Sequence, residues 1–160
     1  MQEIVSYLIE KNISIASVES FTVGAFANKI GSIPGVSKIY RGSMVTYQTQ
    51  IKQKLLQIDQ HKINQFGVVS EEIAYDMAKN GSAIFDCDLC VSFTGNSGPL
   101  PMEDKPVGLC YMGVSFTGNV SVFTLHLNGN REEIKTQAIK EACCIIKEKI
   151  LKIGESYNGY

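Results

Sequence analysis

Hydrophobic and polar residues alternate along this chain with two different periods. Apolar positions three to four residues apart are typical of a helix face, and alternation or a short apolar run is typical of a strand. These patterns predict helices at residues 2–11, 23–30, 48–57, 59–65, from residue 70 onward, and 132–150. They predict strands at residues 13–18, 39–47, 89–93, 107–116 and 120–127.

Local signals mark several element boundaries. Ser70 can cap the helix that follows it, and Glu71 and Glu72 suit the positive end of that helix's dipole. The apolar face of the same helix is expected to comprise Ile73, Ala74, Met77 and Ile84. Gly118 and Asn119 predict the turn of a hairpin between the last two strands.

The order of the elements predicts the fold class. Helices alternate with strands in the first part of the chain, and a hairpin comes late. This order favours an α/β fold, specifically a three-layer α/β/α sandwich with a mixed β-sheet. A length of 160 residues suits a single domain over residues 1–160, with a loose tail from about residue 154.

Composition and charge narrow the function classes. Hydrophobic residues make up 44% of the chain and charged residues 19%, an ordinary globular balance. The formal net charge of -1 gives no long-range attraction to nucleic acid or to a membrane surface. The first residues lack the basic start and apolar run of a signal peptide, so a cytoplasmic location is expected.

The cysteines do not form a regular framework. There are five: Cys87, Cys90, Cys110, Cys143 and Cys144. An odd number without regular spacing favours reduced thiols. Cys87 and Cys90 form a C-x-x-C inside a predicted strand, without further metal ligands nearby, so both are expected to be small buried hydrophobic residues.

Two strand ends are candidate sites, because ligands in open α/β sheets bind where strands lead into loops and helices. Ser20 lies between a predicted strand and a helix, where free N–H groups and the helix dipole would stabilise an anion. The alternative is that Ser20 or Thr22 is only a helix cap. The second place is the segment 94–99, whose glycines would let main-chain amides approach a ligand, unless it is an ordinary turn.

Few groups in the sequence could activate a serine. The two histidines, His61 and His126, lie in neighbourhoods unlike a Ser-His-Asp triad. Lys52 is a candidate base if desolvation deprotonates it, although periodicity does not separate it from a solvated lysine. Arg131 could bind a phosphate or carboxylate, or lie at the surface. No residue cluster suggests a metal site, and no cofactor is expected.

Seven short motifs occur in the order found in one protein family. The family pattern E-S-C-T-G-G corresponds to Glu19-Ser20-Phe21-Thr22-Val23-Gly24. Further matches lie at residues 34–37, 42–47 with Lys52, 67–71 with 77–78, 94–99, 105–108 and 129–135. On these residues the sequence resembles the CinA C-terminal domain, or nicotinamide mononucleotide deamidase, family.

The resemblance implies a three-layer α/β/α fold, usually a homo-oligomer, and hydrolysis of nicotinamide mononucleotide to nicotinic acid mononucleotide and ammonia. It implies that Ser20 is the nucleophile and that Tyr47 and Lys52 activate it, the proton passing to Lys52 directly or through Tyr47. Backbone amides near Ser20 or Gly95 are expected to hold the oxyanion. The residues expected to contact the substrate are Thr22, Gly24, Thr94, Gly95, Gly98 and Arg131.

The sequence departs from the family pattern next to the serine. Phe21 replaces a cysteine and adds bulk, and Val23 replaces a glycine and would be strained at positive φ. Two other functions therefore remain open: a catalytically weak or inactive domain that binds a nucleotide or a partner protein, and a structural or oligomerising domain. An enzyme needs Ser20, Lys52 and Arg131 together, whereas a binding domain need not keep Lys52.

Overall fold

The computed structural model describes the backbone of residues 1–157 and the side chains of residues 1–150. The helices are α1 (Gln2–Glu10), α2 (Ala25–Gly31), α3 (Thr49–Leu56), α4 (Gln60–Phe66), α5 (Glu71–Phe85) and α6 (Arg131–Tyr157), with a 3₁₀ turn η1 (Val36–Lys38). The strands are β1 (Ile15–Glu19), β2 (Tyr40–Val45), β3 (Leu89–Gly95), β4 (Leu109–Phe116) and β5 (Asn119–His126). Each predicted helix and strand is present, with its ends displaced by a few residues.

The strands form one mixed sheet in the order β2-β1-β3-β4-β5. β1 runs parallel to both β2 and β3, whereas β4 and β5 are antiparallel to their neighbours. β1 and β3 are buried along almost their whole length, because helices cover both faces of the sheet.

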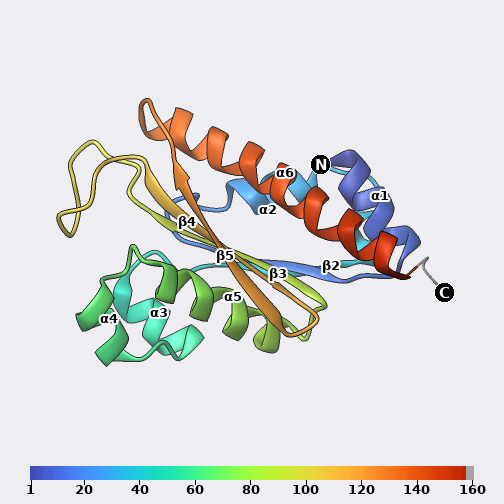
Figure 1. The fold of residues 1–160 in the computed structure, drawn as a ribbon, viewed down its shortest axis with the longest axis horizontal. Helices are drawn as coiled ribbons and strands as arrows, with labels where there is room; N and C mark the ends of the chain where they lie inside the picture. Colours follow the sequence, from blue (N-terminus) through green and yellow to red (C-terminus); the bar gives the residue numbers. More distant parts are fainter. Residues whose placement is uncertain (158–160) are drawn as a thin grey trace.

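Helices form the two outer layers. Figure 1 shows α1, α2 and α6 on one face of the sheet and α3, α4 and α5 on the other. Successive residues of a strand point to opposite faces. Accordingly, Ile15 and Val91 join the core beneath α1, α2 and α6, while Ala16 and Cys90 join the core beneath α3–α5. The predicted three-layer α/β/α sandwich with a mixed sheet is confirmed.

The predicted hairpin turn is displaced by one residue. Phe116 pairs with Asn119, so the two loop residues are Thr117 and Gly118 rather than Gly118 and Asn119. Both adopt positive φ, 46° and 84°, as a two-residue turn matched to the strand twist requires. Gly118 suits this backbone, whereas the β-branched Thr117 does not, and this is why the sequence pattern misplaced the turn.

Two further predictions about helices were wrong. Ile84 is 47% exposed, and Phe85 instead packs against the core at the end of α5, because the inward stripe there has moved by one residue. The last helix does not end at residue 150, since α6 continues to Tyr157. The rest of the expected tail, residues 158–160, lies outside the described residues.

The parallel strands bring three sequence segments to one edge of the sheet. The Ser20 amide donates to the Phe93 carbonyl at 3.0 Å, and the Thr46 amide donates to the Glu19 carbonyl at 2.8 Å. The loop of residues 96–108, yellow in Figure 1, leaves β3 at this edge. The carboxyl ends of β1, β2 and β3 therefore meet where a ligand site is expected.

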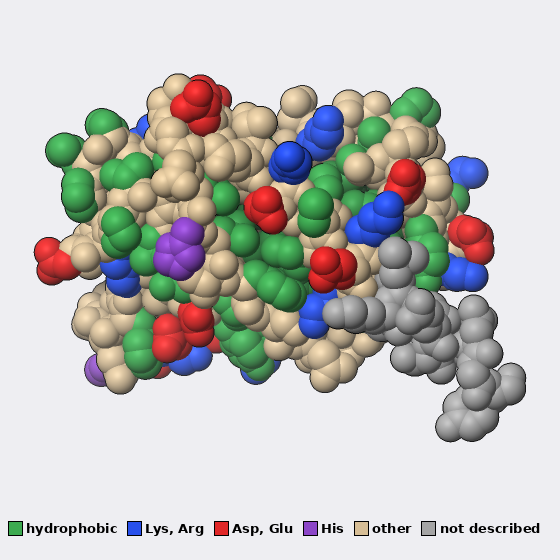
Figure 2. Space-filling view, turned by 45° about the horizontal axis from the view of Figure 1, so that its top comes forward, with side chains coloured by type: hydrophobic (Ala, Val, Ile, Leu, Met, Phe, Trp, Pro, Cys, Tyr) green, Lys and Arg blue, Asp and Glu red, His purple; other side chains and the backbone are tan. Residues whose placement is uncertain are grey.

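The surface carries charges of both signs. Figure 2 shows acidic and basic side chains interspersed over one face, outside the part that grey atoms cover. Within the described part of the chain, no helix combines the length and the apolar character needed to cross a membrane.

Candidate functional site

Ser20 and Lys52 are in direct contact at the end of β1. Lys52 lies on the inward side of α3, one turn before Leu56, and is 1% exposed. Its amine nitrogen lies 2.9 Å from the Ser20 hydroxyl oxygen. The same nitrogen donates to the carbonyl oxygens of Thr46 at 2.7 Å and Tyr47 at 3.0 Å. The fold therefore places a buried amine against the strand-end serine.

The surroundings of Lys52 make it easier to deprotonate than a lysine in water. Burial lowers the pKa of Lys52 from 10.5 to about 8, and the charge of Glu103 opposes this shift. Among the described residues, Lys52 takes part in no ion pair. A neutral amine has two N–H groups for the two carbonyls, which leaves its lone pair for the proton of the Ser20 hydroxyl.

The lowered pKa of Lys52 predicts a pH-dependent stability. Between about pH 8 and 10.5 the unfolded chain holds a proton on this amine that the folded chain has released. The free energy of unfolding should therefore rise with pH across this window, by roughly 3 kcal/mol from this group, and the gain is lost below pH 8. Chemical denaturation of wild-type and Lys52→Met protein between pH 7 and 11 measures this free energy. If the free energies of unfolding of the two proteins differ by the same amount at every pH, the lowered pKa of Lys52 is contradicted.

Neither Ser20 nor Thr22 caps helix α2. The cap residue of α2 is Gly24, which has no side chain, and the Glu19 carboxylate accepts instead from the amides of Phe26 and Ala27. Thr22 donates its hydroxyl to the same carboxylate at 2.7 Å. The interpretation of Ser20 as a helix cap is therefore wrong, and its hydroxyl is free to interact with Lys52.

The two departures from the family pattern are accommodated differently. The Phe21 side chain is 3% exposed and packs in the core beneath α2 and α6, so most of its bulk is directed away from the serine. Val23 adopts φ 49° and is 54% exposed. A β-branched residue in this conformation is strained, and the protein retains the turn despite that cost.

Replacing Val23 with glycine is expected to stabilise the protein. Glycine adopts positive φ without steric strain, and little apolar surface is lost at an exposed position. We expect a gain of about 1 kcal/mol, measured by chemical denaturation. The control is Val45→Gly at an exposed position in strand β2, which should instead destabilise by about 0.5–1 kcal/mol. Destabilisation by Val23→Gly would show that the turn has no such strain.

A cavity of about 660 Å³ opens beside the Ser20–Lys52 pair. Of the predicted site residues, those that line it are Ser20, Tyr47, Lys52, Thr94, Gly95, Gly98 and Arg131. Thr22 and Gly24 do not line it, because they turn away with the start of α2. The cavity is large enough for a mononucleotide-sized ligand.

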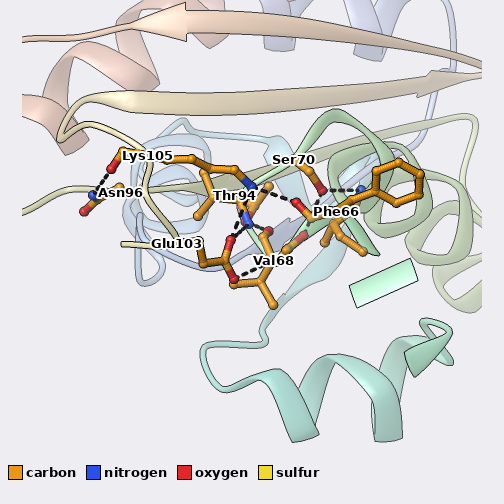
Figure 3. Close-up of polar contacts among 10 residues, drawn as sticks. Phe66, Val68, Ser70, Thr94, Asn96, Glu103 and Lys105 are labelled. Atoms are coloured by element: carbon orange, nitrogen blue, oxygen red, sulfur yellow. Dashed lines mark hydrogen bonds and ion pairs between the residues drawn. The ribbon is translucent and has the colours of Figure 1, made fainter. Parts of the chain in front are cut away.

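The far wall of the cavity is built by a loop that we call the strap, residues 96–108. Figure 3 shows how it is attached. The Glu103 carboxylate accepts from the amides of Val68 at 2.8 Å and Val69 at 3.2 Å, and Lys105 donates to the Phe66 carbonyl at 2.7 Å. Nothing in the hydrophobic pattern indicated these contacts. They hold the strap against the segment that precedes α5.

Thr94 links β3 to the segment that precedes α5, and Asn96 links the first residue of the strap to its later part. The Thr94 hydroxyl donates to the Val68 carbonyl at 2.6 Å, and the Asn96 amide group donates to the Lys105 carbonyl at 3.3 Å (Figure 3). The proton of the Thr94 hydroxyl is thus used within the protein, while its oxygen can still accept from a ligand.

Arg131 also lines the cavity. Its guanidinium group donates to the Gly98 carbonyl and lies 3.5 Å from the Tyr47 hydroxyl. Tyr47 thus offers its carbonyl to Lys52 and its hydroxyl to Arg131, and Ser20 is not among the partners of that hydroxyl. In the structure Ser20 contacts Lys52 directly, and the described residues show no hydrogen bond between the Ser20 and Tyr47 hydroxyls.

The other candidate groups lie elsewhere. His61 and His126 do not line the cavity. Cys90 is buried in β3 as expected, whereas Cys87 is only half-buried and donates its thiol to the Leu89 carbonyl at 3.3 Å. Within the described residues, no group of three or more His, Cys, Asp or Glu side chains could hold a metal ion.

Comparison with known proteins places this geometry in a family. The family model described as the CinA C-terminal domain matches residues 1–150. A competence-damage inducible protein of Listeria innocua is 38% identical over 91% of this chain, and one of Geobacillus is 38% identical over 97%. The chain spans only 35% and 37% of the length of these two relatives.

Solved structures share the fold. A CinA superfamily protein from Klebsiella pneumoniae superimposes with a TM-score of 0.92 at 22% identity, covering 94% of this chain and 95% of that protein. A CinA superfamily protein from Escherichia coli gives 0.84 at 27% identity, covering 86% and 81%. With the family match over residues 1–150, these findings show that the chain belongs to the CinA C-terminal domain family.

Proposed function

We propose that this domain hydrolyses the carboxamide of nicotinamide mononucleotide, releasing ammonia and nicotinic acid mononucleotide, with Ser20 as the nucleophile. The observation that carries the proposal is the 2.9 Å contact between the Ser20 hydroxyl and the buried amine of Lys52. A serine is a weak nucleophile unless a neighbouring base accepts its proton. The lowered pKa of Lys52 leaves a usable fraction of that base near neutral pH.

The first step forms a tetrahedral intermediate. The Ser20 proton moves to the lone pair of Lys52 as the serine oxygen bonds to the carboxamide carbon, and the carbonyl electrons move onto oxygen. Backbone amides are the expected donors to that oxyanion. Phe21 lines the cavity, and its amide has no acceptor among the described residues, so this amide is a candidate donor.

The leaving group then departs and water completes the reaction. The tetrahedral intermediate collapses and the carbon–nitrogen bond breaks. The Lys52 ammonium gives its proton to the leaving nitrogen, so that ammonia departs and the Ser20 ester remains. The neutral amine next accepts a proton from water as that water attacks the ester. Ser20 recovers its hydrogen when the acid leaves, so the cycle consumes only the amide and one water molecule.

The remaining cavity residues are suited to an anionic nucleotide. Arg131 can pair with phosphate oxygens through N–H groups not used by Gly98. One part of the cavity lining is polar and comprises Gln48, Thr49 and Gln50. Another part, on the strap, is apolar and includes Leu100 and Met102. A ligand with a charged end and a flat aromatic end fits this division.

Replacing Tyr47 with phenylalanine tests whether the proton path is direct. The substitution removes the hydroxyl near Arg131 but leaves the carbonyl that orients Lys52. If Ser20 passes its proton straight to Lys52, kcat should change by less than about tenfold, while KM rises. A loss of kcat by roughly a thousandfold would instead assign the hydroxyl a role in proton transfer.

Ammonia release from nicotinamide mononucleotide by the purified protein tests the proposed function. Release that depends on protein concentration, with one nicotinic acid mononucleotide formed for each ammonia, supports it. Saturable binding of the nucleotide without release would contradict it and would favour the nucleotide-binding alternative.

A further inference from the structure

The start of helix α2 is capped in an unusual way. The residues preferred at a helix cap use their own side chain to accept from the amide of the second or third helical residue. The cap residue here is Gly24, so that group is missing. Glu19, five residues earlier and directly before Ser20, reaches these amides instead, at 3.2 Å for Phe26 and 2.9 Å for Ala27.

The Glu19 carboxylate is fully buried and collects four hydrogen bonds. One oxygen accepts from the Thr22 hydroxyl and the Phe26 amide, and the other from the Ala27 amide and, at 3.4 Å, the Ser17 hydroxyl. Within the described residues it has no cationic partner. The amides at the positive end of α2 stabilise its charge instead.

Hydrogen bonds hold both ends of the turn that contains Ser20. On the strand side, the Ser20 amide is bonded to the Phe93 carbonyl of β3. On the helix side, the carboxylate holds Thr22 in the middle of the turn and the first turn of α2 after it. Between these points Val23 and Gly24 adopt φ 49° and 85°, a backbone that an unsupported valine would leave.

We infer that Glu19 is a positioning residue, which acts through Thr22 and the start of α2 to aim the Ser20 hydroxyl at Lys52. Glu19 touches neither the cavity nor Lys52, so its effect is geometric. The inference rests on the proposed role of Ser20 as nucleophile. It also gives Thr22, which does not line the cavity, a function of a different kind from substrate contact.

The chemistry of the contacts requires a carboxylate at this position. All the partners of Glu19 donate hydrogen to it, and a carboxylate only accepts. In Glu19→Gln, one carboxylate oxygen is replaced by an NH2 group. Each Glu19 oxygen accepts from one amide of α2, so in either orientation of the glutamine side chain its NH2 group would face a helix N–H group. Thr22→Val removes one donor while keeping the shape of the side chain, and Thr22→Ser keeps the donor.

A fluorophosphonate probe, which labels activated serines, tests the inference without any nucleotide. The rate of labelling at Ser20, identified by peptide mass, is measured from pH 6 to 10 in wild-type, Glu19→Gln, Thr22→Val and Thr22→Ser proteins. Thr124→Val serves as the control, because it removes the bond that an exposed hydroxyl on β5 donates to Glu71 of α5. Near-UV circular dichroism checks that each variant is folded.

We expect labelling to slow by about 10- to 100-fold in Glu19→Gln and Thr22→Val, and by less than about threefold in Thr22→Ser. The inflection of the pH profile should stay near pH 8, because Lys52 remains buried. Wild-type labelling rates in a folded Thr22→Val protein would overturn the inference. An inflection that moves up towards pH 10.5 would also overturn it, because it would mean that water has reached Lys52 through a loosened core.

The test separates this inference from the proposed substrate. If wild-type Ser20 is labelled and the variants are slow, but nicotinamide mononucleotide yields no ammonia, the positioning role stands and the substrate is wrong. If the probe does not label wild-type Ser20 but labels a known serine hydrolase under the same conditions, both the positioning role of Glu19 and the nucleophilic role of Ser20 are contradicted. Should Glu19→Gln fail to fold, the Thr22→Val and Thr22→Ser pair decides alone.

Discussion

Replacing Ser20 with alanine is expected to lower ammonia release from nicotinamide mononucleotide by roughly a thousandfold or more. The substitution removes the only hydroxyl among the described residues that lies in hydrogen-bond contact with the buried amine of Lys52. Water could replace the serine only poorly, because the ester route divides one difficult step into two easier ones. Steady-state assays of ammonia release measure the change in kcat, and calorimetry measures nucleotide binding separately.

The control for this substitution is Ser6→Ala on the exposed side of α1, which should leave the rate unchanged. We expect nucleotide binding by Ser20→Ala to weaken by less than about tenfold, because the lost group acts mainly on kcat. Wild-type turnover by Ser20→Ala would remove Ser20 from the chemistry and leave Lys52 to activate water instead.

Replacing Lys52 with arginine should have an effect of similar size, about 10²–10⁴-fold on kcat. Arginine keeps the positive charge and can still donate to the Thr46 and Tyr47 carbonyls, but it does not lose its proton at any accessible pH. The exposed Lys54 on the same helix supplies the matched control, Lys54→Arg, which should behave as wild type.

The pH profile adds a second readout for Lys52. Burial lowers its pKa to about 8, and only the neutral amine can accept the Ser20 proton. The wild-type kcat/KM should therefore rise about tenfold per pH unit below pH 8 and level off above it. The residual activity of Lys52→Arg should lack this inflection. An equal inflection in both proteins would assign it to another group.

The sequence located the site because strand ends can be recognised from periodicity. Ser20 follows a short apolar run and precedes a helix, so its place at the sheet edge could be predicted. Helical periodicity could not show that Lys52 is buried, because a lysine on an inward face looks the same as one on an outward face. Lys52 and Leu56, one turn apart, are both buried, a pairing that only the tertiary contacts reveal.

Glu19 and Glu103 could not be assigned from the sequence. A buried carboxylate at the end of a strand has no periodic signature, and its partners in α2 are found only when the turn folds back. Glu103 reaches Val68 across 35 positions of the chain, so no local pattern connects them. One signal was present for Glu19: a glycine at the start of the expected helix, Gly24, has no side chain with which to cap it.

The roles of Thr22 and Tyr47 changed for a related reason. Resemblance identifies which residues belong to a site but not which atoms face the ligand. Thr22 bonds to a buried carboxylate, and Tyr47 contacts Lys52 through its backbone rather than its hydroxyl. Arg131 and Gly98, by contrast, both line the cavity, and Arg131 donates to the Gly98 carbonyl.

The most direct test of the account is the mass of the Ser20 peptide during turnover. Protein mixed with excess nicotinamide mononucleotide near pH 8 is quenched in acid at successive times, digested and analysed by mass spectrometry, while ammonia is measured in parallel. We expect a fraction of Ser20 to carry the nicotinic acid mononucleotide acyl group. This group should form with the first ammonia, and hydroxylamine should remove it as the corresponding hydroxamate. Steady ammonia release, with Ser20 unmodified at every time and no hydroxamate formed, would contradict the account.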